Sequence, residues 1–140
     1  MVLTPTYHVF KMYVDNMEAV NIPVNITSDT FNAENERDRN GQRTSPYLSA
    51  SASRMKDGTV NISLANADLD NSNTVTISLG SIKGKIQNAV LLTSKDMKDH
   101  NTFENPNKVV PVEFKKAKIN KNGELVVEMP KMSIVTLQIK

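Results

Sequence analysis

Short segments of alternating apolar and polar residues run through most of this chain and constrain its fold more than any other feature. Successive side chains of a β-strand point to opposite faces of its sheet, so this alternation predicts strands with one buried face. The predicted strands lie around residues 20–26, 48–53, 60–65, 74–79, 90–92, 112–116, 125–129 and 135–139. Roughly seven to nine short strands separated by turns predict a mainly β fold, an antiparallel β-sandwich.

The connections between these strands carry further predictions. Lys56-Asp57-Gly58 and Asn120-Lys121-Asn122-Gly123 are tight-turn signals, and each predicts a hairpin. The segment Thr27–Ser45 is polar and has no periodicity, which predicts a long exposed loop. The continuous apolar run Val90-Leu91-Leu92 predicts a central strand that is covered on both faces.

The N-terminal segment has the pattern of a helix. Thr4 suits an N-cap and Pro5 is tolerated in the first turn, so we expect a helix from there to near Met17. A narrow polar stripe at spacings of three and four is formed by His8, Lys11, Asp15 and Glu18. The remaining circumference is apolar and carries Tyr7, Val9, Phe10, Met12, Tyr13, Val14 and Met17. Such a helix needs partners on more than one side, so we expect residues 1–18 to lie between two structural units, one of them the sandwich of residues 19–140.

Composition excludes several classes of function. A chain of 140 residues suits a single domain. Its 17 basic and 15 acidic residues are interleaved, which does not favour nucleic-acid binding. No apolar run is long enough to span a membrane, and no export signal is visible in this chain. The lack of cysteine excludes disulfides and thiol catalysis and leaves the compartment undecided.

The polar segment 99–111 is the most distinctive part of the chain. Asp96, Asp99 and Glu104 cluster near His100, and a pair of carboxylates is the minimum for glycoside hydrolysis. Nothing near them would desolvate an acid and raise its pKa, so we expect no catalytic residue here. The favoured interpretation is structural. His100, Asn101 and Thr102 bind local backbone, Phe103 inserts into the core, and Pro106 and Pro111 stiffen the two ends.

Metal and cofactor sites are not expected. Residues 68–73 have the alternating oxygens of a calcium loop, but Asn73 and Leu79 stand where that loop needs glycine and glutamate, so a hairpin turn is favoured. No glycine-rich phosphate loop is present. The three tyrosines are expected to pack rather than to form a sugar platform, and Tyr47, which follows Pro46 at a strand start, is the one for which partial exposure is most expected.

Four segments together resemble a known family. They are residues 4–13 (TPTYHVFKMY), 47–53 (YLSASAS), 60–66 (VNISLAN) and the loop from His100 to Pro111 (HNTFENP to P). Over essentially the whole chain these residues resemble the C-terminal part of glycoside hydrolase family 51 α-L-arabinofuranosidases. The resemblance implies a jelly-roll-like sandwich that follows a catalytic (β/α)8 barrel, with both catalytic glutamates in barrel segments that match nothing here.

The resemblance implies a non-catalytic accessory domain that is inactive alone. Its parent enzyme would hydrolyse terminal α-L-arabinofuranosyl residues of arabinoxylan or arabinan. The helix would contact the barrel through Tyr7, Phe10, Tyr13 and Met17. The structural loop signature would be His100, Asn101, Thr102, Phe103, Glu104, Pro106 and Pro111.

The chain departs from the family pattern at Val14-Asp15-Asn16-Met17 and along Thr27–Ser45. Members of the family usually borrow a strand from the far N-terminus of the enzyme. Without that strand a sheet edge would be open and would favour a homo-oligomer. Two alternatives remain: a carbohydrate-binding module, which a chain without tryptophan supports poorly, and a free-standing interaction protein.

Overall fold

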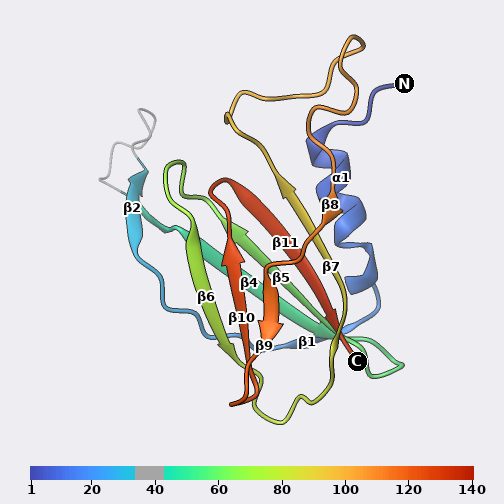
Figure 1. Cartoon of the computed structure of the whole chain (residues 1–140), viewed down its shortest axis with the longest axis vertical. Coiled ribbons are helices and arrows are strands. Elements are labelled where there is room, and N and C mark those ends of the chain that lie inside the picture. The colour runs from blue at the N-terminus through green and yellow to red at the C-terminus, as the bar shows by residue number, and fades with distance from the viewer. Residues whose placement is uncertain (34–42) are drawn as a thin grey trace.

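A six-stranded antiparallel sheet forms the larger layer of the fold. A computed structural model describes residues 1–33 and 43–140 of the chain. The strands of the larger sheet are β1 Val20–Ile22, β4 Leu48–Arg54, β5 Val60–Asn66, β7 Ile86–Thr93, β8 Val112–Glu113 and β11 Ser133–Ile139. Their order across the sheet is β1-β4-β5-β11-β7-β8 (Figure 1).

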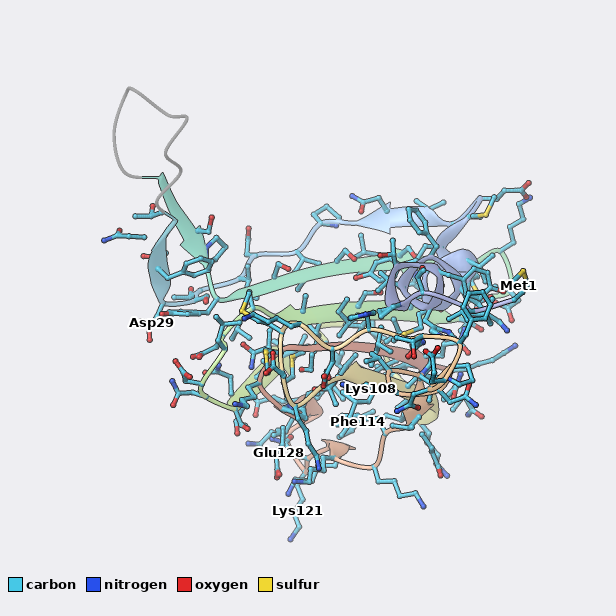
Figure 2. All side chains as sticks on the ribbon, turned by 90° about the horizontal axis from the view of Figure 1, so that it is seen from above. Met1, Asp29, Lys108, Phe114, Lys121 and Glu128 are labelled. Carbon is cyan, nitrogen blue, oxygen red and sulfur yellow. The ribbon has the colours of Figure 1, made fainter. Side chains whose placement is uncertain are left out.

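A three-stranded antiparallel sheet covers one face of the larger sheet. It consists of β6 Asn73–Ser78, β9 Ala117–Ile119 and β10 Glu124–Met129, in the order β6-β10-β9. The helix α1 Pro5–Met12 and the short 3-10 helix η1 Val14–Asn16 lie on the other face. Figure 2 shows this separation, with Lys121 and Glu128 on the side of the molecule opposite to α1.

The core lies between the two sheets. Its fully buried members are at most 1% exposed and include Leu64, Val135 and Leu137 from the larger sheet and Leu125, Val127 and Met129 from the smaller one. In β10 and β11 every second residue is buried, as the alternating pattern predicts. The predicted antiparallel β-sandwich with one N-terminal helix is therefore confirmed.

Both predicted hairpins are present. β4 pairs with β5 across the Lys56-Asp57-Gly58 turn, with Arg54 opposite Val60. β9 pairs with β10 across the second turn, where the side-chain oxygen of Asn120 accepts bonds from the backbone N–H groups of Asn122 and Glu124. Gly123 there has a φ of +78°, a conformation that glycine adopts without strain.

Several connections differ from the prediction. The segment Thr27–Ser45 is not a loop throughout, because β2 Thr30–Ala33 pairs with β3 Arg43–Pro46 in a hairpin. Residues 34–42 of that predicted loop lie outside the described residues. Residues 67–72 do not form a hairpin turn, since they carry the chain from the larger sheet to the smaller one. Asp68 shapes this crossing by accepting bonds from the backbone N–H groups of Asp70 and Asn71.

The predicted strands around residues 90–92 and 112–116 also differ. β7 lies between β11 and the two-residue β8, so it is next to an edge and not central. The strand buried on both faces is β5. The predicted strand at 112–116 is broken, because β8 ends at Glu113 and β9 begins at Ala117 in the other sheet. Among the described residues, no helix has the length and apolar character needed to cross a membrane.

Candidate functional site

The N-terminal helix begins and ends at recognisable signals. Thr4 is the N-cap, and its side-chain oxygen accepts a bond of 3.1 Å from the backbone N–H of Tyr7. Pro5 occupies the first turn, where its missing N–H breaks no helical bond. The α-helix ends at Met12, earlier than predicted, and η1 continues the helical path to Asn16. Glu18, with a φ of +61°, then turns the chain toward β1.

An apolar stripe of four residues lies on the exposed side of this helical segment. Tyr7, Phe10, Val14 and Met17 are 44%, 76%, 51% and 74% exposed. Tyr7 and Phe10 lie on α1, Val14 begins η1, and Met17 follows it. We call this set the apolar stripe. Tyr13, which was also predicted to contact a barrel, lies outside the stripe and is half-buried. Exposed apolar patches of this kind mark interaction surfaces.

The opposite side of the helical segment meets the larger sheet through polar groups. Asn61 in β5 donates a bond of 2.8 Å to the backbone oxygen of Asp15, and Gln138 in β11 donates one of 3.0 Å to the Asp15 carboxylate. Ser53 donates to the side-chain oxygen of Asn16. The predicted polar stripe thus turns largely toward the sandwich, and its member His8 is only 8% exposed.

Sequence reasoning found the polar stripe but not its direction. The signal that could have shown it lies in the strands. Asn61 and Ser63 alternate with the core residues of β5, and Thr136 and Gln138 do the same in β11. The outer face of the sheet is polar along this line, so the helix that covers it presents polar side chains.

Asn101 anchors the loop between β7 and β8. Its side chain is buried, and its amide nitrogen donates bonds of 2.8 Å and 2.9 Å to the backbone oxygens of Leu3 and Val109. Its side-chain oxygen accepts a bond of 2.7 Å from the backbone N–H of Val109. These bonds close the loop and tie it to the segment that precedes α1. The predicted role of Asn101 in binding local backbone agrees with this geometry.

An ion pair reinforces the same loop. The Nζ atom of Lys108 lies 2.6 Å from Oδ1 of Asp99, and the Ser94 hydroxyl also donates to the Asp99 carboxylate. The bonds from Lys108 and Ser94 lower the pKa of Asp99 to about 2. The pKa of Glu104 is lowered too, by its own backbone N–H and by the Thr102 hydroxyl. A general acid needs a raised pKa, so neither carboxylate is prepared for that role at neutral pH.

The other loop residues divide between anchored and exposed positions. Thr102 accepts a bond from the N–H of Asn105 and closes a turn, and the His100 ring lies 2.9 Å from the backbone oxygen of Lys98. The prediction that Phe103 inserts into the core is wrong, because its side chain is 83% exposed. The turn closed by Thr102 spans residues 102–105 and carries Phe103 outward, while Val109 is the loop residue that is buried.

Among the described strands, none pairs with the outer edge of β6 in the smaller sheet. β6 pairs with β10 on one side, and a groove of about 580 Å³ runs between its other side and residues 22–27. Val75 and Ile77 of β6 line this groove together with the exposed Val24 and Ile26. Unpaired strand edges beside apolar side chains are places where another strand can add.

Comparison with known proteins identifies the family. Residues 1–133 match the family model described as the alpha-L-arabinofuranosidase C-terminal domain. The chain belongs to this family. It is 44% identical, over 100% of its own length and 26% of the relative's, to an intracellular exo-α-L-arabinofuranosidase of Bacteroides ovatus. The arabinofuranosidase C-terminal domain therefore spans about a quarter of that relative's length.

Solved structures agree with this assignment. A family 51 arabinofuranosidase from Xanthomonas axonopodis pv. citri matches the domain with a TM-score of 0.87 and 33% identity, over 100% of this chain and 27% of that one. A thermostable family 51 enzyme from Thermotoga petrophila RKU-1 has a TM-score of 0.80 at 24% identity, over 99% of this chain and 29% of that one, and shows the shared fold. The chain is therefore a C-terminal accessory domain of the type found in family 51 arabinofuranosidases.

Two further expectations for this arabinofuranosidase domain concern metals and aromatic residues. Across residues 1–33 and 43–140, no three His, Cys, Asp or Glu side chains gather as a metal site would require. Tyr47 is half-buried and packs against Phe31, with ring centroids 5.0 Å apart. The prediction that Tyr47 is partly exposed agrees with this position, although Tyr7 on the apolar stripe is more exposed.

Proposed function

We propose that this domain docks through α1 onto a catalytic (β/α)8 barrel in the same polypeptide. The apolar stripe carries the proposal, because its four side chains are exposed while the opposite side of the helix already contacts the sandwich. Residues 1–18 would then form the joint between the two units, and residues 19–140 the sandwich. The parent enzyme would hydrolyse terminal α-L-arabinofuranosyl residues of arabinoxylan or arabinan through two carboxylates of the barrel.

Replacement of Phe10 by aspartate in the full-length polypeptide tests the docking. Burying a charge at the contact is costly, so we expect Phe10→Asp to separate the unfolding of the sandwich from that of the barrel in calorimetry. The matched control is Leu69→Asp, which changes another exposed apolar residue, 46% exposed, in the connection from β5 to β6. If the Phe10→Asp polypeptide unfolded in one calorimetric transition, as the unmodified polypeptide is expected to do, that result would contradict the docking.

The activity of the chain alone provides a second test. We expect the 140-residue chain to release no nitrophenol from nitrophenyl α-L-arabinofuranoside. Both catalytic carboxylates would belong to the barrel, and the pKa values of Asp99 and Glu104 in this chain are lowered. Turnover above that of buffer would contradict the accessory role. The positive control is the full-length enzyme, which should release nitrophenol well above the buffer rate under the same conditions.

We also propose that an extended strand from elsewhere in the polypeptide occupies the groove beside β6. The supporting features are the free edge of β6 and the apolar lining of the groove. In the 140-residue chain this edge would pair with a second copy, so we expect a homo-oligomer in light scattering behind a sizing column. A monomer at high concentration would contradict that expectation.

A further inference from the structure

A cavity lies between the helical segment and the outer face of the larger sheet. Its volume is about 390 Å³, and its walls come from α1, η1, β5, β7 and β11 and from Pro111. Sites for small molecules range over roughly 300–1,000 Å³, whereas one water takes about 30 Å³ of liquid volume. The cavity is therefore large enough for a small organic molecule. It lies on the side of α1 that faces away from the apolar stripe.

His8 is one of the buried polar residues that line this cavity, together with Asn61 and Ser63. Its side chain is 8% exposed and lines the cavity from α1. Its Nε2 atom is fully buried and has no hydrogen-bond partner among the described residues. Leaving such a group unpaired costs about 1–3 kcal/mol, so buried polar groups in folded proteins are almost always paired. A fully buried atom is also closed off from the cavity, so the unpaired Nε2 cannot contact a molecule bound there, and His8 contributes wall to the cavity through the rest of its ring.

Three neighbouring side chains have unused hydrogen-bonding capacity. Ser63, Asn88 and Thr136 line the cavity from three adjacent strands, and none of their side chains bonds to another described residue. By contrast, Asn61 and Gln138 are bonded to each other and to Asp15. Hydroxyl and amide groups can both donate and accept, which matches the hydroxyl groups of a ligand.

The charges around the cavity oppose each other. Lys11 and Asp15 both line it, four residues apart. Their opposite charges largely cancel, so the cavity favours neither an anion nor a cation. Met12, Val90 and Pro111 add apolar wall beside the polar groups. A ring that carries C–H bonds on one side and hydroxyl groups at its edge satisfies both kinds of wall.

We infer that this cavity binds a neutral polyhydroxylated molecule of monosaccharide size. Ser63, Asn88 and Thr136 bond its hydroxyl groups, and the ring of His8 and the apolar wall contact its carbon skeleton. The site does not depend on the proposed docking to a barrel, because the apolar stripe faces the other way.

To test this inference, the 140-residue chain is titrated with L-arabinose, D-xylose and glycerol. Binding is monitored by the NMR chemical shifts of the backbone amides. We expect saturable shifts at residues of α1, β5, β7 and β11 with one of the two pentoses, at a dissociation constant of about 1–10 mM. Glycerol, which is too small to reach all the walls, should bind more weakly. Sodium phosphate serves as the anionic probe and should give no saturable shift at these residues.

Thr136→Val is the main variant, because it removes one hydroxyl at nearly constant shape. Loss of one hydrogen bond should weaken pentose binding about 3–10-fold. The matched control is Thr76→Val on the exposed face of β6, which should leave binding unchanged. Asn88→Ala, at an exposed position of β7, gives the same test should Thr136→Val fail to fold.

Three results would overturn the inference. Absence of saturable pentose binding would show that the cavity holds water alone. Tighter binding of phosphate than of pentose would make it an anion site. If Thr136→Val or Asn88→Ala bound the pentose as tightly as the Thr76→Val control does, the pentose would bind outside this cavity.

Discussion

The two faces of the larger sheet are covered by different kinds of contact. On the inner face, apolar side chains such as Val135 and Leu137 pack against Leu125 and Val127 of the smaller sheet, all at most 1% exposed. On the outer face, η1 meets the sheet through hydrogen bonds to Asp15, and a cavity with polar walls lies between the helical segment and the strands. The inner layer is therefore stabilised mainly by apolar burial, whereas the cover of the outer face depends on specific polar pairs.

Truncation on the inner face should have the largest effect. Leu125 is 0% exposed, so Leu125→Ala removes buried carbon and leaves a cavity. We expect a loss of about 2–5 kcal/mol in the free energy of unfolding, measured in urea. The same truncation at Leu69, which is 46% exposed, is the control and should cost far less. Equal losses at the two positions would contradict the assignment of the core.

Removal of the Asn101 side chain should have the next largest effect, on the outer side. Asn101→Ala leaves the backbone N–H and oxygen of the buried Val109 without their partners. We expect a loss of about 1–3 kcal/mol and faster hydrogen exchange at the Val109 amide. Asn107→Ala, on the exposed side of the same loop, should change neither quantity. Slow exchange at Val109 in Asn101→Ala would show that the loop closes without this anchor.

The ion pair of the loop predicts a pH dependence. The pKa of Asp99 is lowered to about 2 in the folded chain, from 3.8, so the carboxylate favours folding above about pH 4. This contribution is lost as the pH falls from about 4 to about 2, because the carboxylate becomes protonated. In Asp99→Asn, stability should fall less over this range in acid unfolding followed by circular dichroism. Asp29→Asn, outside the loop, is the control and should follow the unmodified chain.

Replacement on the apolar stripe should have the smallest effect on the chain alone. Phe10 is 76% exposed, so Phe10→Ser should change the free energy of unfolding by no more than about 0.5 kcal/mol. A loss as large as that of Leu125→Ala would mean that the stripe packs against the sandwich. That result would remove the contrast between the two faces and also the reason for the proposed docking.

Much of the inner layer could be predicted from the sequence. Strands with strict alternation, such as β5 and β11, and the Asn-Gly turn before β10 are local signals that tertiary structure did not override. The hairpin of β2 and β3 was missed because its residues are polar and do not alternate. The crossing at residues 67–72 was mistaken for a hairpin because turn residues do not show which sheet the next strand joins.

The outer layer was harder to predict. Tyr7 and Phe10 were correctly assigned to the helix, whereas Met17 lies beyond the end of η1. The burial of His8 depends on the polar outer face of strands distant in sequence. The burial of Asn101 depends on its bond to Leu3, which joins residues 98 apart, while the turn at residues 102–105 carries Phe103 outward. Neither contact leaves a local pattern, so both needed the three-dimensional structure.

The bond from Asn101 to Leu3 also determines how the domain would respond to force. A pull on the N-terminal segment would not peel α1 from the sheet one turn at a time. The load would reach Asn101 first and pass through its two bonds to Val109 into the loop between β7 and β8. The helix and the loop would resist together and yield together, as a single mechanical clamp at this end of the sandwich.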